Sequence, residues 1–164
     1  MSVENLKIKA AVIEEIKEKL EKAESAVVID YIGTTVEQAN ALRKNLREAG
    51  VDYTVYKNTL MAKAIEGTKY EGLKDVLNGP SALAISYDDA TAPARVLAKS
   101  IKDFGKMAFK AGVVEGTFYD ANGMQAIASI PSRDELIAKF MGSIQSPVGK
   151  MVRTFQAIAD AKAE

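Results

Sequence analysis

The chain has 164 residues, 22 of them basic and 22 acidic, so its formal net charge is zero. It contains no cysteine and no histidine, which excludes disulfides and thiolate metal sites and removes the commonest general base and metal ligand of enzymes. An apolar fraction of 48% is typical of a globular protein, no run approaches the roughly 18 apolar residues of a membrane span, and the N-terminus lacks a signal-peptide core, so we predict a cytoplasmic protein. The missing histidine and cysteine count against an enzyme without excluding one.

The first part of the chain predicts helices that alternate with two strands. Apolar residues recur at helical spacing over 5–24, and the β-branched run at 25–31 is typical of a strand buried on both faces. The next helix is expected to begin at Thr34 or Thr35, with a capping-box partner at Glu37 or Gln38, and to run through residue 48 before Gly50. A second strand over 51–56 and a helix over 58–66 follow, with Asn58 as the predicted N-cap.

The second part of the chain predicts further strands and then helices alone. A helical turn at 73–77, a strand at 82–87, a helix at 91–104, a hairpin over 107–119 and a short helix at 121–129 follow one another. Ser132 and Glu135 form a predicted capping box for a last helix that runs to about Ile144, where Ser146 and Pro147 interrupt or kink it.

This order indicates an α+β fold. Two β-α-β halves around one core predict a split β-α-β plait with a mixed sheet and packed helices. Because no strand follows Pro131, we place a domain boundary there, with a globular domain over 1–130 and a helical tail over 131–164 that protrudes as a kinked helix.

The tail carries an apolar stripe after Pro147. Its members recur at helical spacing and are Val148, Met151, Val152, Phe155, Ile158 and Ala159. Two interpretations stay open at this point: the helix folds back on its own domain, or the stripe is a docking site for helices of another protein.

Basic residues supply candidate contacts to RNA, although zero net charge counts against a nucleic-acid binder unless charge is segregated on the surface. Lys57 and Asn58 follow a strand within a β-α-β unit, where ligand contacts concentrate, and such side chains contact phosphate and sugar oxygens. The complete candidate set is Lys7, Lys9, Arg43, Lys44, Arg47, Lys57, Asn58 and Lys63. The alternative interpretation is a solvated helix face plus a helix cap.

Catalytic and phosphate-loop motifs are weak. The Gly33-Thr34-Thr35 turn lacks both glycine-rich nucleotide signatures, and Asp88 with Asp89 is better explained as helix capping. A small-molecule-binding or enzymatic α/β domain therefore remains only a second hypothesis.

Several motifs, in order and over nearly the whole chain, resemble one family. They are Asp30-Tyr31-x-Gly33-x-Thr35-Val36-Glu37-Gln38, Leu42-Arg43-x-x-Leu46-Arg47, Val55-Tyr56-Lys57-Asn58-Thr59-Leu60, Gly79-Pro80-Ser81-Ala82, Ala92-Pro93-Ala94-Arg95-Val96-Leu97, Lys110-Ala111-Gly112 and Pro131-Ser132-Arg133-Asp134-Glu135-Leu136. The family is that of the bacterial large-subunit ribosomal protein L10. Two departures are Ile32 and Thr34, where the family usually has arginine and leucine, and the single Lys63, where many members carry paired arginines.

The resemblance implies a globular domain that binds large-subunit rRNA beside the protein L11, and a C-terminal helix that binds dimers of the stalk protein L7/L12. It implies a ribosome-bound, non-enzymatic protein without a cofactor or a small-molecule substrate. Arg43, Arg47, Lys57 and Asn58 match the basic motif positions of the family, and the stripe after Pro147 matches its dimer-binding helix. At about three helical turns per dimer, the stretch after Ser146 has room for two dimers. A non-ribosomal relative involved in ribosome assembly is a third hypothesis, which the apolar stripe disfavours.

Overall fold

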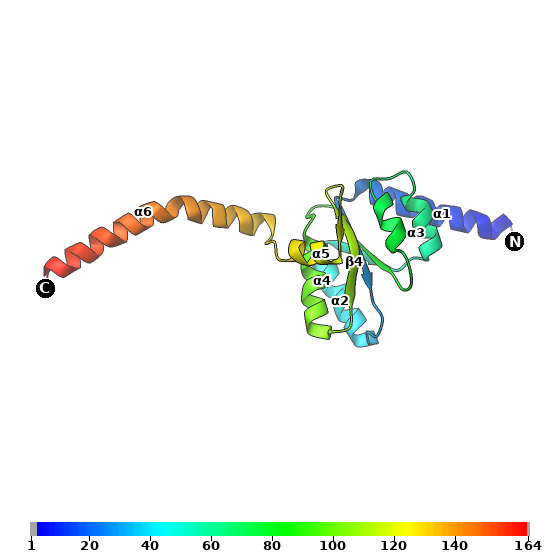
Figure 1. Ribbon diagram of the computed structural model, residues 1–164, viewed down its shortest axis with the longest axis horizontal. Coiled ribbons are helices and arrows are strands. Elements are labelled where there is room, and N and C mark those ends of the chain that lie inside the picture. Colours follow the sequence, from blue (N-terminus) through cyan, green and yellow to red (C-terminus); the bar gives the residue numbers. More distant parts are fainter. Residues whose placement is uncertain (1–2, 164) are drawn as a thin grey trace. The chain divides into compact units, whose positions relative to one another are not determined.

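The computed structural model describes the backbone of residues 3–163, and the side chains of residues 7–147, 149–156 and 158. The chain divides into two compact units, Met1–Ile130 and Pro131–Glu164. The first unit is a sheet covered by helices, and the second is one long helix (Figure 1).

The sheet of the first unit has five strands in the order β2-β3-β1-β4-β5. Their bounds are Ser25–Asp30 for β1, Val51–Thr54 for β2, Ala82–Ser86 for β3, Ala108–Val114 for β4 and Thr117–Asp120 for β5. Both β1 and β2 run antiparallel to β3, which lies between them, so β1 and β2 are parallel to each other. Likewise, β3 and β4 both run antiparallel to β1, which lies between them, so β3 and β4 are parallel to each other. The predicted α+β fold with split β-α-β units is confirmed.

The expectation of a mixed sheet is wrong, because every paired strand is antiparallel. Strand β3 lies between β1 and β2, the parallel strands of the first β-α-β unit, and β1 lies between β3 and β4, the parallel strands of the second unit. The parallel strands of one β-α-β unit therefore never exchange hydrogen bonds with each other, as the register of the pairs shows.

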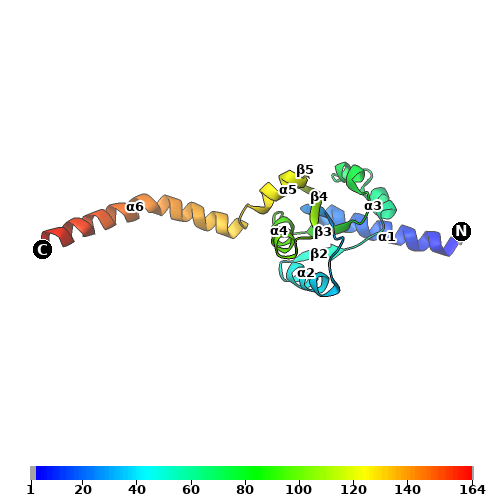
Figure 2. The same ribbon diagram turned by 60° about the horizontal axis from the view of Figure 1, so that its bottom comes forward.

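Helices cover both faces of this sheet (Figure 2). Helices α1 (Val3–Lys22) and α3 (Asn58–Ile65) and the 3₁₀ helix η1 (Glu71–Val76) pack on one face. Helices α2 (Val36–Glu48), α4 (Ala92–Phe104) and α5 (Ala121–Ala128) pack on the other. In β1, Val28 belongs to the first core and Val27 to the second, and both are fully buried, as expected for a strand covered on both faces.

The local signals around α2 act as predicted. The Gln38 backbone N–H donates to Thr35 Oγ1 over 3.3 Å, and the Thr35 backbone N–H donates to Gln38 Oε1 over 3.0 Å, which completes the capping box. Gly50 follows the helix with φ of +70°, a left-handed conformation that favours glycine. The capping box at Thr35 therefore fixes where α2 begins, and Gly50 fixes where it ends.

Two local predictions are wrong. Asn58 is not the N-cap of α3: Lys57 holds that position, and Asn58 Nδ2 instead donates to the Gly79 carbonyl over 2.6 Å. The last helix does not end near Ile144, because α6 (Arg133–Ala163) continues through Pro147 and bends along its length (Figure 1). Proline leaves the carbonyl of Ser143 without its helical N–H, and Ser143 is exposed, so water can take the place of that donor.

Candidate functional site

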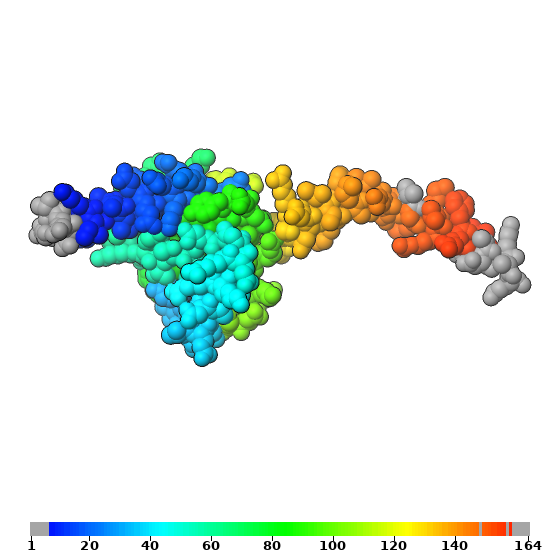
Figure 3. Space-filling view, turned by 180° about the vertical axis from the view of Figure 1, so that it is seen from behind, coloured from blue at the N-terminus to red at the C-terminus, as the bar shows by residue number. Residues whose placement is uncertain are grey.

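Three of the predicted basic residues gather on α2. Arg43, Lys44 and Arg47 are all exposed, and Arg43 and Arg47 face the neighbouring strand β2, which forms one edge of the sheet. Figure 3 shows this face of the globular unit, where the segment around β2 (cyan) lies beside α1 (blue). The structure therefore turns three separate basic positions into one surface.

A groove of about 210 Å³ runs between α2 and the edge strand. Its lining residues are Arg43, Arg47, Val51, Asp52, Tyr53 and Thr54. Burial raises the pKa of the Tyr53 phenol, while the positive charge of Arg43 opposes that change. Tyr53 therefore stays a neutral hydroxyl at pH 7. Tyr53 is not among the residues predicted from the sequence, because its place beside the two arginines depends on the pairing of β2.

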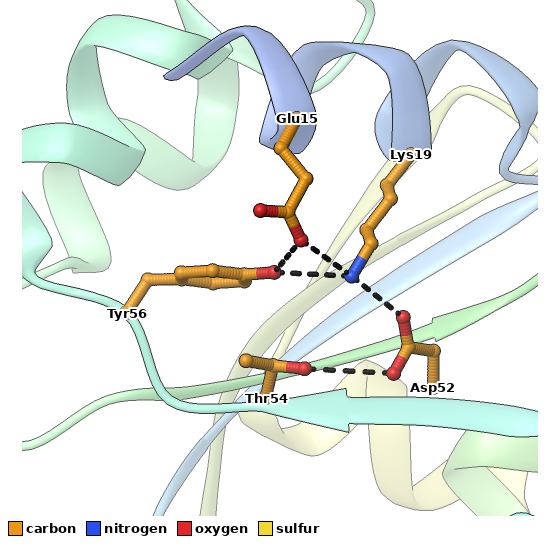
Figure 4. A network of polar contacts seen from close by, with 5 residues as sticks. All are labelled: Glu15, Lys19, Asp52, Thr54 and Tyr56. Atoms are coloured by element: carbon orange, nitrogen blue, oxygen red, sulfur yellow. Dashed lines mark hydrogen bonds and ion pairs between the residues drawn. The ribbon is translucent and has the colours of Figure 1, made fainter. Parts of the chain in front are cut away.

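A polar network anchors the other side of β2 to α1 (Figure 4). Lys19 Nζ lies 3.0 Å from Glu15 Oε1 and 3.1 Å from Asp52 Oδ2, and it donates to the Tyr56 hydroxyl over 3.2 Å. The hydrogen bond with Glu15 is the main cause that raises the pKa of Lys19, and the same bond lowers the pKa of Glu15. Lys19 therefore remains charged at any ordinary pH.

The ion pairs around the groove leave its arginines without a counter-charge. Asp52 pairs with Lys19, and Glu48 lies 3.9 Å from Lys44 Nζ. Within the described residues, neither Arg43 nor Arg47 forms an ion pair, and Arg43 Nη1 donates only to Asn40 Oδ1 over 3.4 Å. Two guanidinium groups one helical turn apart are suited to bind a phosphate.

The remaining predicted RNA contacts lie elsewhere on the globular unit. Lys57 is exposed after the opposite end of β2, Lys63 is exposed in the last turn of α3, and Lys7 and Lys9 are exposed near the start of α1. Asn58 is half-buried, and its hydrogen bond to the Gly79 carbonyl ties α3 to a loop. Its carboxamide donor is thus engaged within the protein.

The loop beside Asn58 is held from a second direction. Lys110 Nζ donates to the carbonyls of Asn78 and Pro80 and to Ser81 Oγ, the last over 3.1 Å. The Asn58, Gly79-Pro80-Ser81 and Lys110 motifs, far apart in the sequence, therefore form one structural unit.

Large apolar side chains are exposed along α6. Of the predicted partner-binding residues, Met151, Val152, Phe155 and Ile158 are between 51% and 60% exposed. The side chains of Val148 and Ala159, which belong to the same predicted set, lie outside the described residues. The stripe is therefore present at each of its four described positions.

A second apolar cluster precedes Pro147 on the same helix. Its members are between 45% and 66% exposed and are Leu136, Ile137, Phe140, Met141 and Ile144. We call this set the proximal cluster, and Met151, Val152, Phe155 and Ile158 the distal cluster. The proximal cluster is not part of the predicted stripe, which begins after Pro147, although the same helical spacing runs through both clusters.

Comparisons with known proteins identify the family. The chain matches the family described as Ribosomal protein L10 over residues 4–102, and the one described as Ribosomal protein uL10 C-terminal region over residues 130–164. Relatives named large ribosomal subunit protein uL10 include that of Clostridium tetani, 48% identical over 158 residues (96% of this chain and 92% of the relative). The protein of Clostridioides difficile is 49% identical over 155 residues (94% and 92%), and that of Bacillus cereus is 41% identical over 159 residues (97% and 96%).

These matches confirm the resemblance that the motifs indicated. Within residues 3–163, no helix combines the length and apolar character that crossing a membrane requires. The relatives are structural proteins, so the prediction that the chain is not an enzyme is also confirmed. The chain belongs to the ribosomal protein L10 family and is a ribosomal protein of the large subunit.

Proposed function

We propose that this ribosomal protein forms the base of the ribosomal stalk, where its globular unit binds large-subunit rRNA beside L11 and α6 anchors dimers of L7/L12. Those dimers recruit translation factors, so the protein acts in the cytoplasm on the ribosome. One observation carries the proposal: among its described side chains, the 31-residue helix α6 exposes nine large apolar ones. An exposed apolar surface of this length indicates a binding partner.

The burial of either cluster would stabilise a complex. Complete burial of a Leu, Ile, Met or Phe side chain contributes roughly 1.5–3 kcal/mol. Four or five such residues per cluster are enough to offset the loss of translational and rotational freedom on binding. Each cluster is therefore a sufficient docking site by itself.

We assign one L7/L12 dimer to each cluster, which gives two dimers on α6. Between the clusters, the described side chains are those of Gln145, Ser146, Pro147, Gly149 and Lys150, and none of these is a large exposed apolar one. Val148, whose side chain lies outside the described residues, also stands in this stretch. This assignment extends the docking site from the segment after Pro147 to the whole of α6.

Charged substitutions within each cluster test the assignment. Phe140→Asp is expected to remove the dimer on the proximal cluster, and Phe155→Asp the dimer on the distal cluster, because an aspartate cannot enter an apolar interface without a large desolvation cost. Native mass spectrometry of the co-expressed complex should count two dimers on the unchanged protein and one on each variant.

Ser146→Asp is the matched control for both variants. Ser146 is exposed and, at about 100° per residue, points about 180° away from Phe155 and about 120° away from Phe140. It should retain two dimers. Three dimers on the unchanged protein, or two on both phenylalanine variants, would contradict the assignment.

The RNA surface that we propose centres on Arg43 and Arg47, with Lys44 beside them and Lys57, Lys63, Lys7 and Lys9 as outlying contacts. Each phosphate contact releases counterions and so contributes to the salt dependence of binding. The double variant Arg43→Ala, Arg47→Ala is expected to weaken binding to in vitro transcribed large-subunit rRNA about tenfold or more. It should also lower the slope of log K against log salt by about two.

The control for this variant removes the same charge from α4. Lys99 and Lys102 are exposed there, and changing both to alanine should leave the affinity within about threefold and the salt slope nearly unchanged. Filter binding across a series of salt concentrations measures both quantities. Equal effects of the two double variants would place the RNA surface elsewhere.

A further inference from the structure

The polar side chains of β2 divide between the two faces of the sheet. Asp52 lies opposite Ile85 of β3, which belongs to the core beneath α1. Tyr53 lies opposite Ala84, which belongs to the core beneath α2. Because residues opposite each other in an antiparallel pair point to the same face, Asp52 faces α1 and Tyr53 faces α2. Tyr53 is therefore the polar side chain that β2 presents on the face of the arginines.

Tyr53 is packed, but its hydroxyl remains open. The residue is half-buried and packs against the core beneath α2. Within the described residues, the tyrosine hydroxyls that form hydrogen bonds are those of Tyr56 and Tyr70, so the Tyr53 hydroxyl has no protein partner there. The buried polar side-chain atoms without a partner are Ser25 Oγ and Arg95 Nη1, so the Tyr53 oxygen is accessible to solvent.

Arg43 brings a positive charge close to this hydroxyl. Burial raises the pKa of the Tyr53 phenol, and the charge of Arg43 opposes that rise only in part. The phenol therefore keeps its proton at pH 7 and is a hydrogen-bond donor. Arg43 and Arg47 line the same groove and form no ion pair among the described residues. A neutral donor thus lies beside two unpaired guanidinium groups.

We propose that the Tyr53 hydroxyl donates a hydrogen bond to a phosphate of the RNA backbone, the same phosphate that Arg43 and Arg47 bind in the groove between α2 and β2. The inference rests on the proposed binding of rRNA by the globular unit. A phosphate offers several acceptor oxygens, so two guanidinium groups and a hydroxyl can bind it together. Because the side chain packs against the core, a hydrogen bond is favoured over stacking with a base.

Three variants of the full chain test this contact. Tyr53→Phe removes the hydroxyl and keeps the ring. Tyr119→Phe is the matched control, because Tyr119 is half-buried against the same core but lies on β5, at the opposite edge of the sheet. The third variant adds Tyr53→Phe to the Arg43→Ala, Arg47→Ala double variant. Filter binding to in vitro transcribed large-subunit rRNA over a salt series measures affinity, and thermal unfolding measures folding.

Tyr53→Phe should bind the transcript about three- to tenfold more weakly than Tyr119→Phe. Its slope of log K against log salt should equal that of the unchanged protein, because a neutral hydroxyl releases no counterion. A variant that had merely displaced the arginines would show a lower slope. In the background that lacks both arginines, Tyr53→Phe should change the affinity by less than about twofold, because the phosphate is no longer held beside it.

Other results overturn the inference. Equal affinities of the two tyrosine variants would show that the Tyr53 hydroxyl does not contact the RNA. A lower salt slope for Tyr53→Phe, or a melting temperature more than about 2 °C below that of Tyr119→Phe, would show that it acts through the arginines or through the fold. A full loss that persists without the arginines would show that they do not share a phosphate.

Failure of the proposed function is distinguishable from failure of this contact. If the unchanged protein did not bind the transcript, the proposed RNA function would fail, and the inference with it. If the unchanged protein bound and the two tyrosine variants bound equally well, the inference alone would be wrong.

Discussion

Asp89 illustrates how a single carboxylate fixes the entry to a helix. Its Oδ1 accepts hydrogen bonds of 2.9 Å from both the backbone N–H and the hydroxyl of Thr91, and its Oδ2 lies 3.3 Å from Arg95 Nη2. Burial by itself would raise the pKa of Asp89, but the contacts with Thr91 and Arg95 outweigh burial and hold that pKa below its ordinary value. The N-cap of α4 is Thr91, which makes no side-chain cap hydrogen bond, so Asp89 does not cap the helix as predicted but holds the cap residue in place from two positions before it.

Asp89→Asn should destabilise the globular unit in a pH-dependent way. Because the folded-state pKa is lowered, the charged carboxylate stabilises the fold above its unfolded-state pKa near 4, and this contribution is lost as pH falls toward the folded-state value. We expect a loss of about 1 kcal/mol at pH 7 and a smaller loss at pH 3. Urea unfolding at both pH values measures the difference.

The neighbouring Asp88 supplies the control, since it is exposed and Asp88→Asn makes the same chemical change one residue away. That variant should unfold like the original protein at both pH values. An equal loss of stability for Asp89→Asn at pH 7 and pH 3 would show that its charge contributes nothing.

Among the elements, α6 is a long helix that contains Pro147, a residue type that destabilises a helix interior. Proline in a helix interior costs about 3 kcal/mol relative to alanine, and glycine costs about 1 kcal/mol. In a peptide of residues 131–164, Pro147→Ala should therefore raise helical content more than Gly149→Ala. Far-UV circular dichroism of the three peptides measures this order, and a larger gain from Gly149→Ala would contradict it.

The elements also show what sequence alone can predict. A capping box at Thr34 or Thr35, with Glu37 or Gln38 as its partner, could be predicted because both partners lie within one turn of the chain, and the structure selects Thr35 and Gln38. Asn58 was wrongly assigned as a cap, because its actual partner is the carbonyl of Gly79, which only the tertiary fold brings near. The proximal cluster of α6 could have been found, since its spacing is as regular as that of the distal cluster.

The candidate site also combines features that the sequence shows locally with features that depend on the tertiary fold. The basic character of Arg43 and Arg47 is visible in the sequence, but the groove requires β2 to be an edge strand. The pairing of Lys19 in α1 with Asp52 in β2 joins residues far apart in the sequence, and no periodicity or motif indicates it. Residue types could thus be predicted locally, whereas their electrostatic surroundings depend on long-range packing.

At the scale of the whole molecule, the two units are expected to be separable. All five strands and both apolar cores lie within Met1–Ile130, so the globular unit does not depend on α6 for its buried surface. A chain that ends at Ile130 should therefore keep its melting temperature within about 2 °C of the full-length value, because it loses no core contact.

The same truncation should divide the two proposed binding functions. The shortened chain retains Arg43 and Arg47, so its affinity for large-subunit rRNA should stay within about twofold. It lacks both apolar clusters and should bind no L7/L12 dimer in native mass spectrometry. Retained dimers would place the docking site on the globular unit, and a large loss of RNA affinity would place RNA contacts on α6.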